Sequence, residues 1–530
     1  MTICKDSGTR PTTPRVSRRR LLQSTAALGA ASAIPASLLG RPARAATPKR
    51  GGHFRVGIGG GSTSDSLDPA TYENSFMQGI GGALHNMLTE VGPDGSLEPA
   101  LATEWEASPD AVTWTFKLRK DVVFHNGKTL AAEDVIASLN HHRGEDSQSA
   151  AKVTVDPIKS MKALDAHTVE VELESGNADL PFLVSDYHLV IMPSKDGAVD
   201  ANSGIGTGPF RVEHYDPGIR CGLTRNPDYF REGRPYFDSM DFLVLADKAA
   251  RTNALLTGEI DYMDRCDLKT VHLLKRRAGV VVEETTGMQH YTIPMNMTVA
   301  PFSDNNVRMA LKHAIDREAI VKTILRGYGS VGNDNPIAPT NRYFNADIPQ
   351  RVYDPDKARY YVKQAGLGTL AVELSAADAA FAGCVDTAVL YREHAAGAGI
   401  DITVKREPDD GYWANIWMKK PWSFSYWGGR PVEDQMFSVA YLTGAAWNES
   451  FQSIERFDKL LVAARAELDE DRRREMYAEM QLIVHNEGGA VIPMFANYVN
   501  AYSDKVAHGP VVGGNIDLDG LRIAERWWFA

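Results

Sequence analysis

Large apolar and small polar residues alternate along residues 422–437, WSFSYWGGRPVEDQMF. Trp422, Phe424 and Tyr426 fall on every second position, which is the period of one face of a β-strand. Residues 428–431, Gly-Gly-Arg-Pro, are poorly suited to continue a ladder, because glycine is conformationally free and proline has no N–H to donate. The pattern therefore predicts a strand that ends in an exposed turn.

The predicted turn carries side chains suited to holding a ligand. Trp427 offers a flat apolar ring, Gly428 permits close backbone approach, and the guanidinium of Arg430 matches a carboxylate or phosphate. The alternative is an ordinary loop at the end of a strand. In that case Arg430 forms only a surface ion pair with Glu433 or Asp434.

Apolar residues recur at helical spacing in the second half of the chain. Residues 307–315 carry them on one face, and Asp316 is placed to cap a following helix that stops at Gly327. Two further stripes lie at 454–464 and 476–484. We interpret all three as core-facing helices in an alternation of helices and strands. The stripe residues are Val307, Ala310, Leu311, Ala314, Ile315, Ile454, Phe457, Leu460, Leu461, Ala464, Met476, Met480, Ile483 and Val484.

The first half begins with shorter, strand-like units. Residues 53–57 alternate as a strand and lead into the loop Gly-Gly-Gly-Ser-Thr-Ser at 59–64. This spacing matches neither a dinucleotide fingerprint nor a Walker loop, so the loop is either ligand-adjacent or a plain flexible turn. Residues 113–128 then alternate and turn at an Asn-Gly pair, and a helical pattern starts at 131–135. Together these segments predict a small α/β unit.

Length and composition indicate a soluble globular protein. The 530 residues favour two or three domains, and 43% hydrophobic with 24% charged residues is ordinary for a globular chain. No apolar run in the body of the chain is long enough to cross a bilayer, so we expect no membrane span.

The amino terminus has the order of a twin-arginine export signal. Consecutive arginines at 18–20 precede a soft apolar region at 21–40, and Ala-Arg-Ala at 43–45 is a signal-peptidase site. We expect cleavage near residue 45 and a product free in the periplasm. The net charge is −11, and residues 1–45 hold eight of the positive charges against one negative charge. The mature chain is therefore more acidic still, which disfavours nucleic acid as a partner.

Neither cysteines nor catalytic motifs suggest a metal site or an enzyme. Cleavage removes Cys4 and leaves Cys221, Cys266 and Cys384, of which one pair could form a disulfide that the sequence does not specify. There is no Cys/His cluster at zinc spacing, no nucleophile elbow and no metalloprotease motif. We expect no metal, no cofactor and no catalysis, with a periplasmic hydrolase as a remote alternative.

One histidine pair superficially resembles a set of metal ligands. His141 and His142 stand close to Glu145 and Asp146. Adjacent residues on a helix point about 100° apart, so the pair is interpreted as a solvated helix end.

A series of short motifs runs through nearly the whole mature chain in a distinctive order. The series strongly resembles family 5, or cluster C, of the extracellular solute-binding proteins of ABC importers, which includes dipeptide, oligopeptide and nickel receptors. Each motif alone is weak, and their order is what carries the resemblance. The motifs are ALHNMLTE at 83–90, PDG at 93–95, LEPALA at 97–102 with Trp105, TWTFKLR at 113–119, VVFHNGK at 122–128, GTGPF at 206–210, RNPDYF at 225–230, LTGEID at 256–261, NVRMAL at 306–311, AIDR at 314–317 and YDPDKA at 353–358.

The resemblance implies an α/β fold, the two-lobe periplasmic-binding-protein fold of type II, with an extra subdomain inserted in the first lobe. By matching, lobe I holds residues 46–287 and 494–530, the inserted subdomain lies near 76–203, and lobe II holds 288–493. The chain then crosses between lobes near 284–296 and again near 487–495.

The resemblance also implies a function and a site. The protein would be a monomeric periplasmic receptor that captures a peptide or peptide-like small polar solute and delivers it to an inner-membrane ABC permease. Alternatives are a non-peptide anionic solute, such as an opine or a sugar phosphate, and a nickel chelate. The expected ligand-binding residues are Ser62 and Thr63 from one lobe, Trp427, Gly428 and Arg430 from the other, and, more weakly, Trp413, Trp447 and Asn448.

Arg430 departs from the family's pattern. Peptide-binding relatives carry an acidic residue at the matching position, where it pairs with the free amino terminus of the ligand. A guanidinium repels an ammonium by about 1 kcal/mol at 4 Å in water and by more in a drier cleft. A shift of one residue in the loop would instead bring Glu433 or Asp434 nearer. The substitution predicts a ligand with an anionic group, or one without the usual free amine. For the aromatic residues of the site, simple core packing is the alternative.

Overall fold

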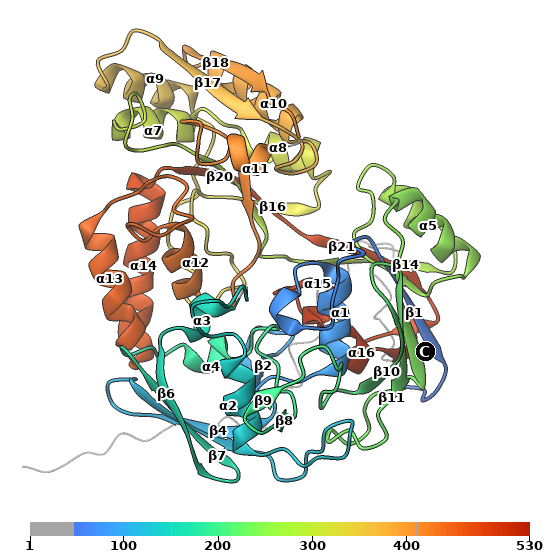
Figure 1. Cartoon of the computed structure of the whole chain (residues 1–530). Coiled ribbons are helices and arrows are strands. Elements are labelled where there is room, and N and C mark those ends of the chain that lie inside the picture. The colour runs from blue at the N-terminus through green and yellow to red at the C-terminus, as the bar shows by residue number, and fades with distance from the viewer. Residues whose placement is uncertain (1–46, 150, 410) are drawn as a thin grey trace, which may run out of the picture. The chain divides into compact units, whose positions relative to one another are not determined.

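The computed structural model describes residues 47–149, 151–409 and 411–530 (Figure 1). The expected export signal and its cleavage site, residues 1–45, lie outside the described residues, as does Cys4. Within the described ranges no helix combines the length and the apolar character that a bilayer crossing requires.

A seven-stranded mixed sheet is built around β1 (His53–Ile58), the strand predicted at 53–57. β1 runs parallel to β12 on one side and to β13 on the other. Phe54, Val56 and Ile58 are fully buried against a core to which α1 (Ser75–Leu84) contributes. In sheet order the strands are β10 (Phe210–Asp216), β11 (Arg220–Arg225), β12 (Ser239–Val244), β1, β13 (Tyr262–Met263), β21 (Tyr498–Ser503) and β14 (Val280–Thr285).

A separate antiparallel sheet follows early in the chain and has its own core. It is covered by α2 (Ala132–Asn140), which begins within the predicted helical segment. The Pro-Asp-Gly turn joins β2 (Thr89–Val91) to β3 (Leu97–Pro99). The observed unit lies inside the expected subdomain. Its strands, in sheet order, are β4 (Ala102–Ala107), β5 (Thr113–Leu118), β7 (Thr168–Leu173) and β6 (Ile158–Asp165).

The second half of the chain holds two smaller sheets with helices packed on them. Predicted stripes lie on α7, α13 and α14, and most of their residues are buried. Asp316 caps α8 as predicted, accepting a hydrogen bond from Ala319 N at 2.9 Å, although the helix ends at Ile324, before Gly327. The elements are β15 (His290–Pro294), β16 (Gly329–Val331), β19 (Ser425–Trp427) and β20 (Ala490–Ala496); β17 (Leu370–Ala376) and β18 (Ile400–Arg406); α7 (Asn305–His313), α8 (Arg317–Ile324), α9 (Pro355–Gln364), α10 (Cys384–Ala396), α11 (Tyr412–Asn415), α12 (Glu433–Ala440), α13 (Glu455–Ala466) and α14 (Glu470–Glu487).

Two short segments connect the seven-stranded sheet with the sheet of β15 and β20 (Figure 1). Residues 286–289 lead from β14 to β15, inside the first crossing expected from the sequence. The second change of sheet occurs at Asn497, two residues beyond the expected stretch 487–495, because β20 continues to Ala496 in its pairing with β16. Adjacent antiparallel strands thus carry the chain across in opposite directions.

The described cysteines lie in three different parts of the fold. Cys221, Cys266 and Cys384 are all buried with free thiols. The structure therefore forms none of the disulfides that the sequence left open among them.

Candidate functional site

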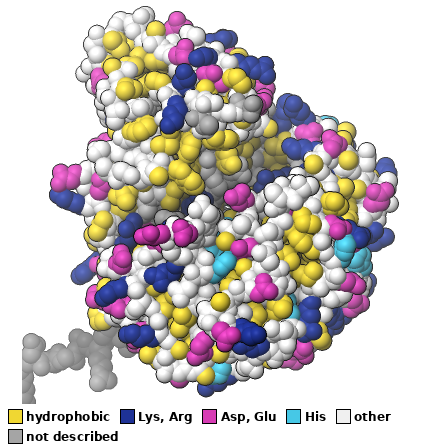
Figure 2. Space-filling view, viewed as in Figure 1, with side chains coloured by type: hydrophobic (Ala, Val, Ile, Leu, Met, Phe, Trp, Pro, Cys, Tyr) yellow, Lys and Arg dark blue, Asp and Glu magenta, His cyan; other side chains and the backbone are white. Residues whose placement is uncertain are grey.

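A large cavity opens between the seven-stranded sheet and the second half of the chain. Its volume is about 2170 Å³, well above the few hundred to one thousand Å³ that small-molecule sites usually occupy. Figure 2 shows the face of the molecule hollowed here, with apolar side chains gathered above the hollow. The size of the cavity leaves room for a solute the size of a short peptide or larger.

The stretch 422–437 contributes one wall of the cavity. Trp422 and Phe424 are buried in the core, whereas Tyr426, on the same alternating register, stands nearly half exposed and lines the cavity. The strand β19 is confirmed, but it spans only Ser425–Trp427 and pairs with β15. The period of two is therefore correct, and the core simply ends before Tyr426.

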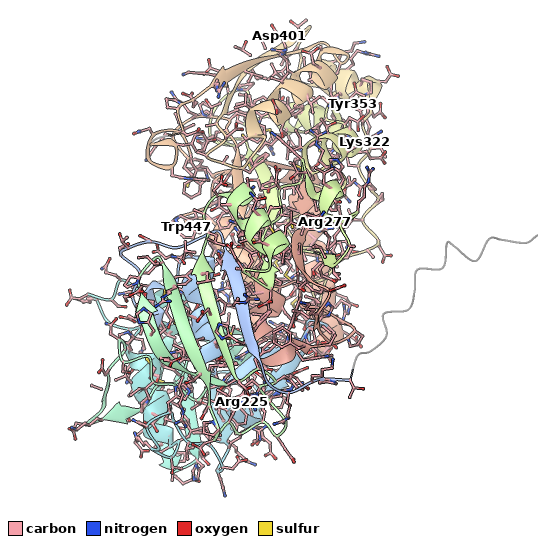
Figure 3. The ribbon with its side chains drawn as sticks, turned by 90° about the vertical axis from the view of Figure 1, so that its right-hand side faces the viewer. Arg225, Arg277, Lys322, Tyr353, Asp401 and Trp447 are labelled. Atoms are coloured by element: carbon pink, nitrogen blue, oxygen red, sulfur yellow. The ribbon has the colours of Figure 1, made fainter. Side chains whose placement is uncertain are left out.

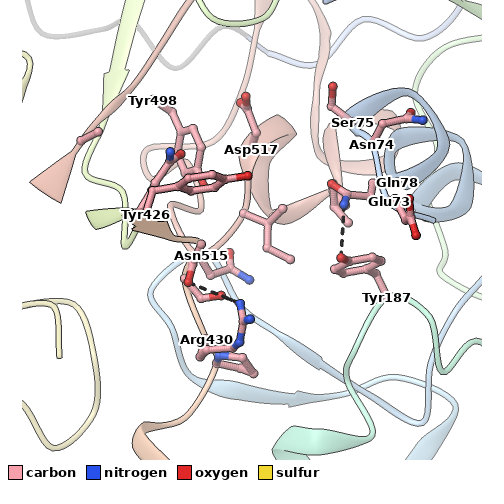
Figure 4. Close-up of a pocket in the computed structure, with 18 of the residues that line it drawn as sticks. Glu73, Asn74, Ser75, Gln78, Tyr187, Tyr426, Arg430, Tyr498, Asn515 and Asp517 are labelled. Carbon is pink, nitrogen blue, oxygen red and sulfur yellow. Dashed lines mark hydrogen bonds between the residues drawn. The ribbon is translucent and has the colours of Figure 1, made fainter. Parts of the chain in front are cut away.

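Arg430 lines the cavity and has no carboxylate partner among the described residues. Its Nη1 donates to the carbonyl oxygens of Gly429 at 3.2 Å and Gly428 at 3.4 Å, and its Cζ lies 5.9 Å from the centre of the Trp427 ring (Figure 4). Burial lowers the pKa of Arg430, while Tyr187 and Asp186 act in the opposite direction. The cation is thus only partly compensated and keeps donors for a ligand.

The surface ion pair considered for Arg430 is wrong, because both acidic candidates are buried elsewhere. Glu433 accepts a hydrogen bond from Tyr343 N at 2.6 Å. Asp434 accepts one from Arg465 Nε at 2.8 Å. Helix α12 begins at Glu433 and turns these carboxylates into the protein.

The other predicted residues of this lobe divide between the cavity and its surroundings. Gly428 and Trp447 line the cavity. Trp427 is buried behind the wall, where its Nε1 donates to Glu449 Oε1 at 3.0 Å. Asn448 is buried and its amide holds the local loop, donating to Gln452 O at 2.8 Å. Trp413 is exposed beside Tyr426 and is not among the residues that line the cavity.

The loop after β1 contributes different residues from those predicted. Gly59 and Gly60 line the cavity, but Ser62 and Thr63 are exposed and do not. Gly61 packs against Val244, and the chain then turns away, so that the two hydroxyl residues lie outside the wall.

The polar wall opposite Arg430 was missed in the sequence. Residues 73–75 and Gln78 at the start of α1 face the cavity together with Tyr187, whose hydroxyl accepts from Gln78 Nε2 at 3.2 Å (Figure 4). Asn74 caps α1 by accepting from Met77 N at 3.1 Å. An Asn before an apolar run is a helix-start signal, so the helix could have been found, although its position at the cavity could not.

Two further acidic residues of the wall are already paired. Asp264 contacts Arg251 Nε at 3.0 Å and Asp517 contacts Arg265 Nε at 3.3 Å. Burial raises the pKa of Asp264 to about 6. These two carboxylates are therefore already occupied by arginines of the protein, whereas Arg430 has no such partner among the described residues.

The histidine pair after α2 is part of the packed structure. His142 is fully buried, with Nδ1 2.6 Å from Ser149 Oγ, and His141 Nε2 lies 2.8 Å from Asp68 Oδ1. The expected solvated helix end is therefore wrong, because the loop after β1 and the segment around Ser149 cover it. In the ranges described, no group of three or more His, Cys, Asp or Glu is arranged to hold a metal ion.

Sequence comparison finds relatives that are binding proteins. The dipeptide-binding protein of Escherichia coli K12 is 26% identical over 455 residues, covering 77% of this chain and 83% of that protein. The glutathione-binding protein GsiB of Pectobacterium atrosepticum is 27% identical over 310 residues, 58% of this chain; the match spans 60% of that protein's length, less than two thirds.

A solved structure shows the same architecture. The periplasmic binding protein DppA of Helicobacter pylori, in complex with the peptide STSA, matches with a TM-score of 0.73 at 24% identity and covers 91% of this chain and 98% of that one. This match confirms the two-lobe α/β fold with an inserted subdomain.

A family model agrees with the ordered motifs. The model described as bacterial extracellular solute-binding proteins, family 5 Middle, matches residues 96–449, which is more than half of the chain. The chain belongs to the bacterial extracellular solute-binding proteins of family 5.

Proposed function

We propose that this protein is the receptor of an ABC importer that captures a peptide or peptide-like small polar solute and hands it to an inner-membrane permease. The observation that carries the proposal is a cavity walled by both sheets, which in the described part of the chain are joined by two short connections, at 286–289 and Asn497. Connections of this kind suit segments that absorb a rotation of one lobe against the other.

Ligand capture would close the cavity because the ligand makes more contacts in the closed form than in the open form. A solute that touches both walls binds the closed form more tightly than the open form, and only this difference shifts the equilibrium. The lobes would be residues 46–287 with 494–530, including the subdomain near 76–203, and residues 288–493. The mature protein would be a periplasmic monomer exported by the twin-arginine route, and it would release its ligand unaltered, as a binding protein does.

The receptor proposal is tested by identifying the solute and then measuring closure. Mass spectrometry of the folded protein as purified identifies what it retains. Small-angle scattering with and without a saturating amount of that solute should show a more compact particle when bound. Identical profiles would contradict capture by closure, and hydrolysis of the solute during incubation would favour the hydrolase.

For the ligand's charge, we propose an anionic group that meets Arg430. The supporting observation is a guanidinium that lines the cavity with only backbone carbonyls and an indole as partners among the described residues. This also favours the second candidate, a receptor for a non-peptide anion such as an opine or sugar phosphate. A nickel chelate stays a weaker alternative.

The Arg430 proposal is tested by calorimetric titration of Arg430→Ala with the retained solute. A charge-assisted contact contributes about 1.5–3 kcal/mol, so affinity should fall roughly tenfold or more. Arg456→Ala is the matched control, because Arg456 is an exposed arginine on α13 that pairs with Glu479 outside the cavity. Unchanged affinity in Arg430→Ala would remove Arg430 from the site.

A further inference from the structure

Four aromatic side chains form a connected surface at the edge of the cavity, which we call the aromatic shelf: Trp413, Trp417, Tyr426 and Trp447. Ring centres lie 5.6 Å apart for Trp413 and Tyr426, 5.8 Å for Trp413 and Trp417, and 6.4 Å for Trp417 and Trp447. The residues come from α11 and the segment after it, from β19 and from the loop after α12. The fold therefore gathers them from three separate stretches of chain.

The shelf is unusually exposed for its composition. Trp413 exposes 40% of its surface, Tyr426 45% and Trp447 50%. Figure 3 places Trp447 at the middle level of the molecule, between Arg225 of β11 below and Asp401 of β18 above. Contiguous exposed aromatic surface is costly in water and usually marks a place that is covered in the working protein.

A buried carboxylate fixes the shelf from beneath. Glu449 accepts hydrogen bonds from Trp417 Nε1 at 2.8 Å, Trp427 Nε1 at 3.0 Å and Thr292 Oγ1 at 2.7 Å. The indole N–H groups of Trp417 and Trp427 thus point into the protein. Trp427 in turn supports Trp447, whose ring centre lies 6.0 Å away. Trp417 is thus held in place before anything binds, and Trp447 packs between it and Trp427, which reduces the entropy cost of stacking on this part of the shelf.

The position of the shelf at the cavity indicates which kind of partner covers its exposed rings. Tyr426 and Trp447 are cavity-lining residues, so the occupant is a solute inside the cavity. Arg430 follows Tyr426 by four residues and lines the same cavity. An occupant that meets both features needs a flat apolar group as well as a negative charge.

We propose that the ligand carries a planar aromatic ring that packs against one of the two cavity-facing rings of the shelf, Tyr426 or Trp447, while its anionic group meets Arg430 in the same cavity. This inference rests on the proposed receptor function and specifies its ligand class. An aromatic pair contributes through its geometry beyond the area it buries, whereas a saturated ring of similar size gains only the area. The shelf therefore discriminates aromatic from aliphatic groups.

The first test uses small probes with the mature protein. Binding of 1-naphthylacetate and of its saturated counterpart, decahydro-1-naphthylacetate, is followed by chemical shifts of the indole N–H signals. We expect naphthylacetate to bind about tenfold more tightly, and Tyr426→Ala or Trp447→Ala to remove most of that advantage. Trp447→Phe, which keeps a ring, should retain part of it. Tyr360→Ala is the control, because Tyr360 is 55% exposed on α9 and makes an edge-to-face contact with Tyr361 away from the cavity.

The second test separates the shelf from the receptor function. Ala-Phe and Ala-Leu are titrated into the same set of proteins. A preference for Ala-Phe that disappears in Tyr426→Ala or Trp447→Ala supports both proposals. Equal binding of the two dipeptides, with no effect of the shelf variants, would support the receptor function and contradict the proposal that the shelf binds an aromatic ring.

The small probes give the remaining outcomes. Naphthylacetate binding that depends on the shelf, without binding of either dipeptide, supports the shelf and contradicts peptide capture. Absence of shelf-dependent naphthylacetate binding overturns the shelf proposal.

Discussion

Two buried carboxylates in the second half of the chain have opposite surroundings. Asp334 is enclosed by cations: Arg317 Nη2 lies 2.7 Å from Oδ1, and Arg351 also pairs with it. Glu449 has no cationic partner among the described residues and is held by two indoles and a hydroxyl. We therefore expect Asp334 to stabilise the fold, and Glu449 to orient the aromatic side chains above it.

The pKa values of the two groups shift in opposite directions. Burial alone raises the pKa of Asp334, but Arg317 and Arg351 outweigh burial and bring it below its ordinary value. For Glu449 burial is again the largest effect and the hydrogen bonds do not overcome it, so its pKa is raised. Asp334 is thus stabilised in the interior by arginines, and Glu449 by neutral hydrogen-bond donors. Substitution of each carboxylate tests its own set of partners.

The largest expected effect is the loss of Asp334. Asp334→Ala leaves Arg317 and Arg351 buried without their partner, which costs about 3–5 kcal/mol of unfolding free energy. Urea unfolding at pH 7 measures it. Asp401→Ala, an exposed aspartate on β18, is the control and should change stability by less than about 0.5 kcal/mol. A loss below about 1 kcal/mol for Asp334→Ala would mean that the ion cluster is not a stabilising hub.

The sequence predicts elements whose signals are local. The apolar faces of α7, α13 and α14 follow from the helical period, and Asp316 caps α8 because its partner, Ala319 N, is three residues away. The ordered motifs give the family and therefore the fold. Arg430 could be placed at the site from the sequence because it stands in a turn formed by neighbouring residues, Gly-Gly-Arg-Pro at 428–431.

The predictions that failed depend on distant residues. Ser62 and Thr63 lie outside the cavity wall because the chain turns away after Gly61, which packs against Val244. His141 is covered because Asp68, 73 positions earlier in the chain, contacts it. The sequence singled out Trp413 and Trp447 but not Trp417, which joins them in the shelf, because Glu449, which orients Trp417, lies 32 positions further along the chain. Hydrophobic periodicity depends on neighbouring residues and cannot predict contacts between residues that are far apart in the chain.

Glu433 is a second buried carboxylate without an ion pair among the described residues, and it makes the free energy of unfolding depend on pH in the opposite direction to Asp334. Burial raises the pKa of Glu433 to about 7, against an ordinary value of 4.5. Between these values the folded chain holds a proton that the unfolded chain has lost, so the free energy of unfolding falls as the pH rises. The contribution of Glu433 to this fall is roughly 3 kcal/mol at most. Asp334, with its lowered pKa, acts in the opposite sense and loses its stabilising effect as the pH falls.

Glu433→Gln should remove most of the decline attributed to Glu433. Chemical unfolding of both proteins at pH 5 and pH 8 measures it: the variant should gain stability relative to the parent between the two values. An identical dependence on pH in both proteins would show that Glu433 does not retain its proton in the folded chain.

The smallest expected effect is that of Glu449→Gln, which keeps the shape of the side chain and removes its charge. One amide oxygen still accepts an indole N–H, but the second indole faces an NH₂ group and loses its hydrogen bond, at a cost of about 1 kcal/mol. No buried cation loses a partner in this variant, in contrast to Asp334→Ala, so stability should change far less. The local effect falls on Trp417, whose N–H signal should shift, and naphthylacetate should bind roughly two- to threefold more weakly as the ring loses its orientation. A loss of stability equal to that of Asp334→Ala, with unchanged probe binding, would make Glu449 a structural charge and leave the shelf without its support.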